Sequence, residues 1–220
     1  KLCYERILPH DMNRPMHVLR PLGGAGPARA VIPDIRKLWI NGTTLKVRFM
    51  GGTARQRALV REQAGWWTDH ANLDFDFNDA LDAEIRIAFN ANDGAWSYIG
   101  TDARAIPRDQ PTINLGFLDG GTAAHEFGHA IGLGHEHQNP AGGIEWNEAV
   151  VIRDLGGSPN FWTPEEVRHN VLNKYSVNQY LHGTDFDGES IMLYPFPGTW
   201  TRSGQGTDFN EALSDTDKQF

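Results

Sequence analysis

Residues 125–135 read His125-Glu-Phe-Gly-His129-Ala-Ile-Gly132-Leu-Gly-His135. On a helix, the four-residue spacing of His125 and His129 places both imidazoles on one face, about one turn apart. Both can then bind one ion at about 2.0–2.1 Å, the usual distance between zinc and an imidazole nitrogen. Gly132 has no Cβ and can adopt the left-handed conformation that ends a helix, so that His135 can turn back to the ion. The spacing therefore predicts a site in which three histidines hold one Zn²⁺.

Glu126 follows the first histidine and indicates that the metal is catalytic. It lies about 100° round the helix from His125, which is a poor position for a ligand but within reach of a water on the open side of the ion. There it can act as general base, because the metal lowers the pKa of the water. The pattern favours a zinc-dependent endopeptidase. Two alternatives stay open: a hydrolase of another bond, such as a small-molecule amide, and a zinc-stabilised binding module without activity.

The composition narrows the class of partner. The chain has 220 residues, a formal net charge of −8 and no run of Lys or Arg, which argues against nucleic acid or an anionic membrane surface. No apolar stretch approaches the ~20 residues that span a bilayer. Cys3 is the only cysteine, so no intrachain disulfide can form. The expected partner is a protein or peptide substrate, and the oligomeric state stays unknown.

The pattern before the metal motif is typical of an α+β fold. Alternating apolar and polar residues predict strands, and an apolar stripe with helical spacing predicts a helix. The strands are expected at 44–50, 73–77, 85–89 and 112–118, and the helix at 54–71. Residues 90–111 are expected to form a long functional loop. The strand at 112–118 is expected at the edge of the cleft, where an extended peptide can pair with it.

The chain after His135 contains fewer strand patterns and more loop. Thr163-Pro-Glu-Glu166 predicts a helix start, with an N-cap, a proline in the first turn and a capping box. A last helix is expected from Ser214. We expect an upper subdomain at 37–135 with a twisted mixed sheet and the active-site helix, and a loop-rich lower subdomain at 136–220. Residues 1–36 are expected to form an extension that resembles a pro-segment.

The metal motif with the adjoining Glu136 resembles the astacin family of metzincin zinc proteases, which has a glutamate after the third ligand. Ser190-Ile-Met-Leu-Tyr194 is similar to the Met-turn of that family. Shorter similarities follow in the family's order, at residues 96–100, 113–116 and 213–217. The likeness covers about residues 39–220 and is closest to bacterial-type members. It implies a two-subdomain metzincin-like fold and a zinc metalloendopeptidase.

The resemblance also implies roles for single residues. Tyr194 matches the tyrosine that can ligate zinc or bind the oxyanion, although a structural tyrosine beside Pro195 is the alternative. Met192 matches a packing floor beneath the metal. Glu136 matches a residue that pairs with the mature amino terminus, which the extension at 1–36 puts in question. The disulfide cysteines of animal members are absent.

Two further expectations concern latency and location. A thiolate is a good zinc ligand, so Cys3 on an N-terminal segment can occupy the open position of the metal and silence the enzyme, as in several metzincins. The alternative is a free thiol without a role. Zinc proteases of this type are commonly secreted, which favours secretion and leaves the cytosol open. Arg202 can favour an acidic substrate residue, although a solvated surface arginine is the simpler interpretation.

Overall fold

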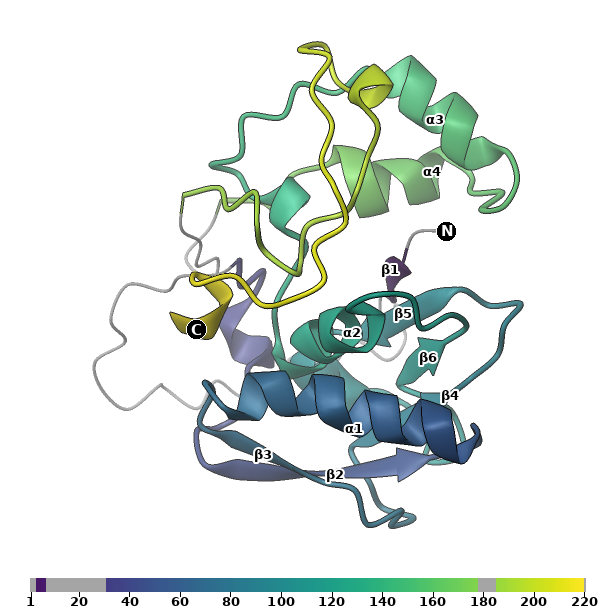
Figure 1. Ribbon diagram of the computed structural model, residues 1–220, viewed down its shortest axis with the longest axis vertical. Coiled ribbons are helices and arrows are strands. Elements are labelled where there is room, and N and C mark those ends of the chain that lie inside the picture. The colour runs from purple at the N-terminus through teal and green to yellow at the C-terminus, as the bar shows by residue number, and fades with distance from the viewer. Residues whose placement is uncertain (1–2, 7–30, 178–184, 220) are drawn as a thin grey trace.

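The computed structural model describes residues 3–6, 31–177 and 185–219. The sheet lies in one half of the molecule together with helices α1 and α2, while α3 and α4 lie in the other half (Figure 1). The strands are β1 Cys3–Arg6, β2 Thr43–Phe49, β3 Leu73–Asp76, β4 Ile85–Ala88, β5 Ala95–Tyr98 and β6 Ile113–Leu115. The helices are α1 Ala54–Thr68, α2 Thr122–Ile131, α3 Glu148–Gly156 and α4 Pro164–Val167, which a π-helical turn at Arg168–Leu172 continues.

The sheet is mixed and has the strand order β1-β5-β6-β4-β2-β3. Strand β2 pairs in parallel with β3 and β4, and β4 pairs in parallel with β6. Strand β5 runs antiparallel to β6, with Ala95 opposite Leu115. Strand β1 pairs in parallel with β5, with Cys3 opposite Ala95. This arrangement, with helices packed on the sheet, confirms the expected α+β class.

Helices α1 and α2 pack against each other and cover the sheet (Figure 1). The main core between them includes Leu45 and Val47 from β2 and Val60, Ala64 and Trp67 from α1, all buried. A second core fills the other half, where Val151 and Leu155 of α3 pack with Trp146, Leu193 and Trp200. The polypeptide after α4 returns towards the sheet half (Figure 1), where Asp217 of the C-terminal turn contacts Ser190 and Ile191.

The elements before the metal motif confirm most of the expected pattern. Strands form within the ranges 44–50, 73–77 and 85–89 with small shifts, and α1 ends at Thr68, three residues before the expected limit of 71. The capping box of Thr163 and Glu166 forms as expected at the start of α4. No helix in the described ranges is long and apolar enough to cross a bilayer.

Three expectations about the elements were wrong. The strand at 112–118 is not an edge strand, because β6 lies between β5 and β4. The expected loop at 90–111 contains β5 and a 3-10 helix at Gly100–Ala105. The helix from Ser214 is only a 3-10 turn at Asp217–Gln219. Strand β1 and part of the 3-10 helix Ile35–Lys37 lie in the expected extension at 1–36, whose likeness to a pro-segment stays a prediction. Helix α3 was not predicted. The remaining residues of the extension, 7–30, lie outside the described part.

Candidate metal centre

Helix α2 is anchored by side chains from outside it, because its N-cap residue Gly121 offers no side chain. Gln63 of α1 replaces the missing cap. Its Oε1 accepts hydrogen bonds from the backbone N–H groups of Ala123 and Ala124 at 2.9 and 3.2 Å. Its Nε2 donates to the carbonyl of Gly120 at 2.6 Å. Free N–H groups at a helix start need such acceptors, so α1 fixes the start of the helix that carries the histidines.

Gly132 ends α2 with a φ of 122°, in the left-handed region that favours glycine. Its N–H donates to the carbonyls of Gly128 and His129. A Cβ at Gly132 would lie 2.5 Å from Cδ2 of Leu38, so the position is also crowded. The turn brings His135 back beside α2, as the sequence predicts.

The three histidines of the motif meet as one cluster of possible metal ligands. One ligand atom from each of His125, His129 and His135 lies within 4.8 Å of the others. The Nε2 atoms of His129 and His135 are 3.0 Å apart, close to the roughly 3.3 Å between two nitrogens that share a tetrahedral zinc ion. The residues present therefore fit a zinc ion.

Hydrogen bonds set the tautomer of each histidine. Nδ1 of His125 faces the carbonyl of Ile191 at 2.7 Å, and Nδ1 of His129 faces that of Leu133 at 2.9 Å. A carbonyl oxygen only accepts, so each Nδ1 carries the proton and each Nε2 presents a lone pair. Nδ1 of His135 faces Oε1 of Gln138 at 3.2 Å. The amide of Gln138 is held in this orientation because its Nε2 donates to two carbonyls, those of residues 169 and 173.

Burial keeps these histidines neutral at pH 7. It lowers the pKa of His125 to about 4, and it lowers the pKa values of His129 and His135 well below their usual range. A neutral imidazole is the form that binds a metal ion. The electrostatics of the site therefore support metal binding near neutral pH without prior deprotonation.

Glu126 lies beside the histidines and is fully buried. It lines the same cavity as His125 and Tyr194. The rest of that cavity is built from the segment before α2, the first residue of α2 and the chain from Ile191 onwards. Its lining comprises Phe117, Gly121, Thr122, Ile191, Leu193, Pro195, Phe209 and Asn210. A carboxylate that shares a cavity with a possible metal ligand is placed to exchange protons with a reactant in that cavity.

Tyr194 reaches the histidine cluster from the segment that resembles a Met-turn. Its ring centroid lies 4.3 Å from that of His135 and 6.0 Å from that of His125. On its other neighbour, His137, it stacks at 4.3 Å with an interplanar angle of 29°. His137 in turn faces the carbonyl of Asn170 with its Nε2 at 2.9 Å. Tyr194 is thus fixed at the site by aromatic contacts.

Met192 lies beneath the motif and contacts α2 at Gly128. A Cβ at Gly128 would collide with Sδ of Met192, so the glycine lets the thioether approach the helix. The backbone N–H of Glu136 donates to the carbonyl of Met192 at 3.0 Å. These contacts join the histidine motif to residues 190–194, two segments that are more than fifty residues apart in the sequence.

Glu136 makes contacts that the resemblance did not predict. Its Oε1 accepts from Nδ2 of Asn139 at 2.9 Å and from the N–H of Asp187 at 3.0 Å. Burial raises the pKa of Glu136 to about 7. Its expected pairing with an amino terminus stays a prediction, since residues 1 and 2 lie outside the described ranges.

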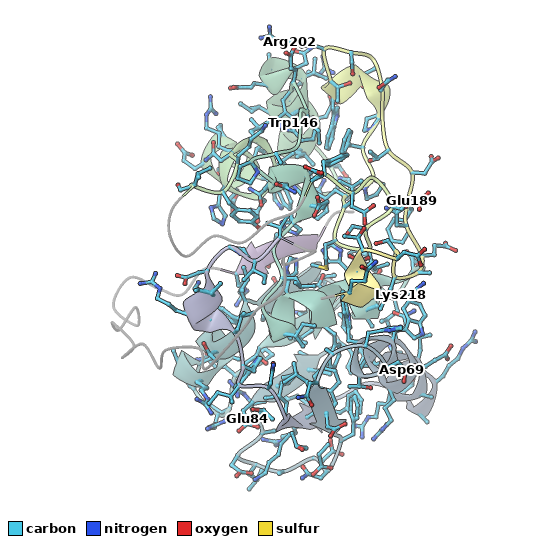
Figure 2. The ribbon with its side chains drawn as sticks, turned by 90° about the vertical axis from the view of Figure 1, so that its left-hand side faces the viewer. Asp69, Glu84, Trp146, Glu189, Arg202 and Lys218 are labelled. Carbon is cyan, nitrogen blue, oxygen red and sulfur yellow. The ribbon has the colours of Figure 1, made fainter. Side chains whose placement is uncertain are left out.

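The other expected site residues lie elsewhere. The backbone of Cys3 is on the outer strand β1. Arg202 is exposed and lies at the outer end of the second half of the molecule (Figure 2). The supporting residues Gln63, His137 and Gln138 were not identified from the sequence. Only Gln138 carried a signal, because a position three residues after a ligand can reach it across one turn.

Comparisons with known proteins agree with this geometry. The family model described as Astacin (Peptidase family M12A) matches residues 32–203. Among solved structures, one titled "Structure of myroilysin" superposes with a TM-score of 0.80 at 35% identity and covers 86% of this chain and 95% of that one. High choriolytic enzyme 1, a hatching enzyme zinc-protease of Oryzias latipes, has a TM-score of 0.54 at 18% identity, covers 83% of this chain and 90% of its own, and shows the fold alone.

Two relatives by sequence are similar over most of this chain. Astacin-like metalloprotease toxin 1 of Loxosceles intermedia is 28% identical over 160 residues, which are 72% of this chain and 54% of the toxin. Tolloid-like protein 1 of Mus musculus is 28% identical over 167 residues, which are 76% of this chain but 15% of that protein. The chain therefore spans about half of one relative and a small part of the other.

Proposed function

The chain belongs to the astacin family of zinc metalloendopeptidases, and from this we propose that it cleaves peptide bonds in proteins with Glu126 as general base. The observation that carries the proposal is the cluster itself. Three buried, neutral imidazoles converge within 4.8 Å, and Glu126 lines the cavity beside them. A structural zinc site does not need a buried carboxylate that is not a ligand.

His125, His129 and His135 are the proposed ligands of one zinc ion. When bound, the ion polarises the scissile carbonyl and lowers the pKa of the attacking water. Glu126 takes a proton from that water and later passes it to the leaving amine. The Tyr194 hydroxyl donates a hydrogen bond to the oxygen of the scissile carbonyl as negative charge develops on it. Stacking between Tyr194 and His137 limits the rotation of the tyrosine ring and supports this role.

The cavity beside Glu126 supports a preference for apolar substrate side chains. Five of its lining residues are apolar: Phe117, Ile191, Leu193, Pro195 and Phe209. Among the described residues that line it, Glu126 is the sole residue with a charged side chain at neutral pH. An acidic substrate side chain would lose its hydration there without gaining a cationic partner.

A peptide-library digest tests this preference. We expect enrichment of apolar residues at the position next to the scissile bond that enters the cavity. Arg202 is exposed and is not one of the residues that line the cavity, so Arg202→Ala should leave the profile unchanged. Enrichment of Asp or Glu at that position, removed by Arg202→Ala, would contradict the proposal.

Glu126→Gln tests the proposed base. The substitution keeps the size of the side chain but removes the proton acceptor, so we expect kcat to fall by about 10²–10⁴. Zinc content should stay near one ion per chain, because Glu126 is not a proposed ligand. Cleavage at the wild-type rate by this variant would rule out the assignment. Loss of zinc from the variant would instead give Glu126 a role in metal binding.

We further propose that the N-terminal strand keeps the enzyme latent. Strand β1 covers the outer edge of β5, and an extended substrate that adds to the sheet needs the same backbone groups. The ring of Tyr4 in β1 lies 6.4 Å from that of Trp96 and 6.2 Å from that of Trp162, which belongs to the other half of the molecule. Arg6 stacks over Trp96 at 3.9 Å. Strand β1 therefore bridges the two halves at this edge.

Cys3, in the first register position of β1, is the proposed latency ligand of zinc. Variants of the full chain separate the two contributions. Cys3→Ser should raise activity if the thiolate occupies the metal, and Tyr4→Ala should raise it if strand pairing is the barrier. If neither variant differs from wild type, and a chain without residues 1–30 is no more active, the latency proposal is wrong.

We also propose that the protein is secreted, which is supported by the relative that is named as a toxin. Detection of the protein only inside the producing cells would contradict this proposal.

A further inference from the structure

A line of three hydrogen bonds connects the carboxylate of Asp217 with the ring of His125. We propose that Asp217 and Ser190 are positioning residues of the metal site, which act on His125 through the peptide unit between Ile191 and Met192. The inference rests on the proposed role of His125 as a zinc ligand. It assigns a function to the C-terminal turn, which lies outside the cavity.

Each link of the line has short, well-defined partners. Nδ1 of His125 donates to the carbonyl oxygen of Ile191 at 2.7 Å. The N–H of the same peptide unit, from Met192, donates to Oγ of Ser190 at 3.0 Å. The Ser190 hydroxyl then donates to Oδ1 of Asp217 at 2.7 Å. All donors point in one sense, so each bond polarises the next.

The carboxylate at the end of this line is held in place by further bonds. Its Oδ2 accepts from the N–H of Ile191 at 2.8 Å and from the N–H of Ser214 at 3.0 Å. The Asp217 N–H donates to Oγ of Ser214 at 2.9 Å, which closes a reciprocal pair. Ser190 and Asp217 are each 2% exposed. Hydrogen bonds to a charged group are strong in such a buried setting. The carboxylate therefore fixes the conformation of residues 190–192.

The dependence on a distant carboxylate distinguishes His125 from the other two histidines. His129 donates to a carbonyl four residues away, and His135 faces an amide three residues away. His125 instead faces a carbonyl 66 residues away in the chain. Its ring orientation is therefore set by residues 190–192, and these are set by Asp217.

The line explains how a carboxylate can serve a metal site without being a ligand. Histidine ligands are commonly oriented by a carboxylate that accepts their second ring proton. Here a hydroxyl and a peptide unit stand between the two. The polarised carbonyl of Ile191 strengthens the bond from Nδ1 and makes Nε2 of His125 a better donor to a cation. The buried negative charge also partly offsets the charge of a dication.

A purely structural role of Asp217 is the alternative, and Ser214 offers the matched control. Ser190→Ala breaks the line but leaves Asp217 bonded to Ile191 and Ser214. Ser214→Ala removes a hydroxyl that also bonds to Asp217, but that hydroxyl lies outside the line. Both variants remove one hydroxyl of a buried serine in the same cluster. Asp217→Asn is a third variant, in which the amide N–H₂ facing Ser190 would reverse the direction of that bond.

The experiment measures zinc affinity of the full chain by chelator competition, together with the ¹⁵N NMR shifts of the histidine rings and the Tm. We expect Ser190→Ala and Asp217→Asn to raise the Kd for zinc by about 10–100-fold. The ring shifts of His125 should change, while those of His129 and His135 stay as in wild type. Ser214→Ala should keep the wild-type Kd and His125 shifts, even where its Tm falls.

Unchanged zinc affinity and His125 shifts in folded Ser190→Ala would overturn the proposal. An equal loss of affinity in Ser214→Ala, or unfolding of both line variants while Ser214→Ala folds, would assign Asp217 a structural role only and also overturn it. A wild-type chain that binds no zinc would contradict the proposed function itself. A wild-type chain that binds zinc and cleaves protein, together with unaffected line variants, would contradict only this inference.

Discussion

Gly132 determines where the third histidine lies, and replacing it tests the geometry of the site at the scale of one residue. Its φ of 122° is unfavourable for any residue with a Cβ, and an added methyl group would meet Leu38. We expect Gly132→Ala to destabilise the fold by at least about 1–2 kcal/mol and to weaken zinc binding. Thermal unfolding and chelator competition measure both effects. An Ala variant with wild-type Tm and zinc Kd would show that the turn is not required.

The proposed role of Tyr194 belongs to the same scale, because it depends on one hydroxyl group. Tyr194→Phe keeps the ring that stacks on His137 but removes the hydrogen-bond donor. We expect kcat to fall by about 10²–10³, as for the loss of one oxyanion donor, with little change in zinc Kd or Tm. Steady-state kinetics on a peptide substrate measure this. A Phe variant with unchanged kcat would leave Tyr194 with the packing role of the alternative interpretation.

The buried histidines give the zinc-free protein a defined dependence on pH. Burial lowers the pKa of His125 to about 4 and that of His137 to about 3, from the usual 6.5. Protons therefore bind the unfolded chain preferentially as the pH falls from 6.5 towards these values. The free energy of unfolding is therefore highest above pH 6.5. Below pH 6.5 it decreases by up to about 1.4 kcal/mol per pH unit for each histidine. Glu136, whose pKa is raised to about 7, opposes this slope as a single group.

Denaturant unfolding of the chelator-treated protein at several pH values between 7.5 and 4.5 measures the slope. We expect the free energy of unfolding to decrease with acidification, and His137→Gln to make the decrease shallower. Stability that stays constant or rises as the pH falls would contradict the neutral state inferred for these rings.

At the scale of elements, helix α2 depends on α1 for its N-terminal cap. Gln63→Leu keeps the approximate volume but leaves the N–H groups of Ala123 and Ala124 without their acceptor. We expect a loss of about 1–3 kcal/mol in the free energy of unfolding and a Tm several degrees lower. Glu62→Leu places the same side chain on the exposed neighbouring position of α1 as a control. Equal stability of the two variants would show that Gln63 does not cap α2.

The elements also show what local sequence patterns can predict. Helix α1 and strand β2 were predicted because the periodicity of their apolar residues is a local signal. The order of strands is not local. The pattern of residues 113–115 is the same for a buried strand at the edge of a sheet and for one in its centre. Only the pairing with β5 on one side and β4 on the other makes β6 a central strand. Strand β5 was missed because it is only four residues long and follows a loop rich in Gly, Asp and Asn.

The sequence predicts the residues of the candidate site more completely than it predicts the order of strands in the sheet. His125, His129, His135, Glu126 and Gly132 lie within one turn of each other or next to a turn, so helical spacing fixes their relation. The supporting residues Gln63 and Asp217 come from other segments. His137 follows His135 closely, but its partners Tyr194 and Asn170 are distant in the sequence, so all three roles depend on how distant elements pack. Spacing along the chain carries no signal for such contacts.

At the scale of the whole molecule, residues that precede β2 belong to the packed structure. Val31 and Ile32 are 1% and 5% exposed, and the N–H of Gly134 donates to the carbonyl of Val31 at 2.8 Å. We keep the division into subdomains at His135 and Glu136 as a proposal, and we propose Val31 as the start of the compact domain, six residues before the expected position 37.

Truncation tests this boundary. A chain that starts at Val31 should fold and bind zinc. A chain that starts at Lys37 should have a lower Tm and a higher zinc Kd than the chain that starts at Val31. The contacts of Val31 and Gly134 beside the third histidine are the reason. Two truncations with the same Tm and Kd would place the boundary back at 37.

The central claim is that zinc at the three histidines and Glu126 together cleave protein chains. The most direct measurement is the digestion of an unfolded protein by zinc-loaded, chelated and zinc-restored chain without residues 1–30, with Glu126→Gln measured beside it. We expect fragments with zinc, none with chelator, fragments again after zinc is restored, and cleavage by zinc-bound Glu126→Gln that is slower by about 10²–10⁴. Fragments in the presence of chelator, cleavage by the Gln variant at the wild-type rate, or a zinc-bound wild-type chain that produces no fragments would contradict the claim.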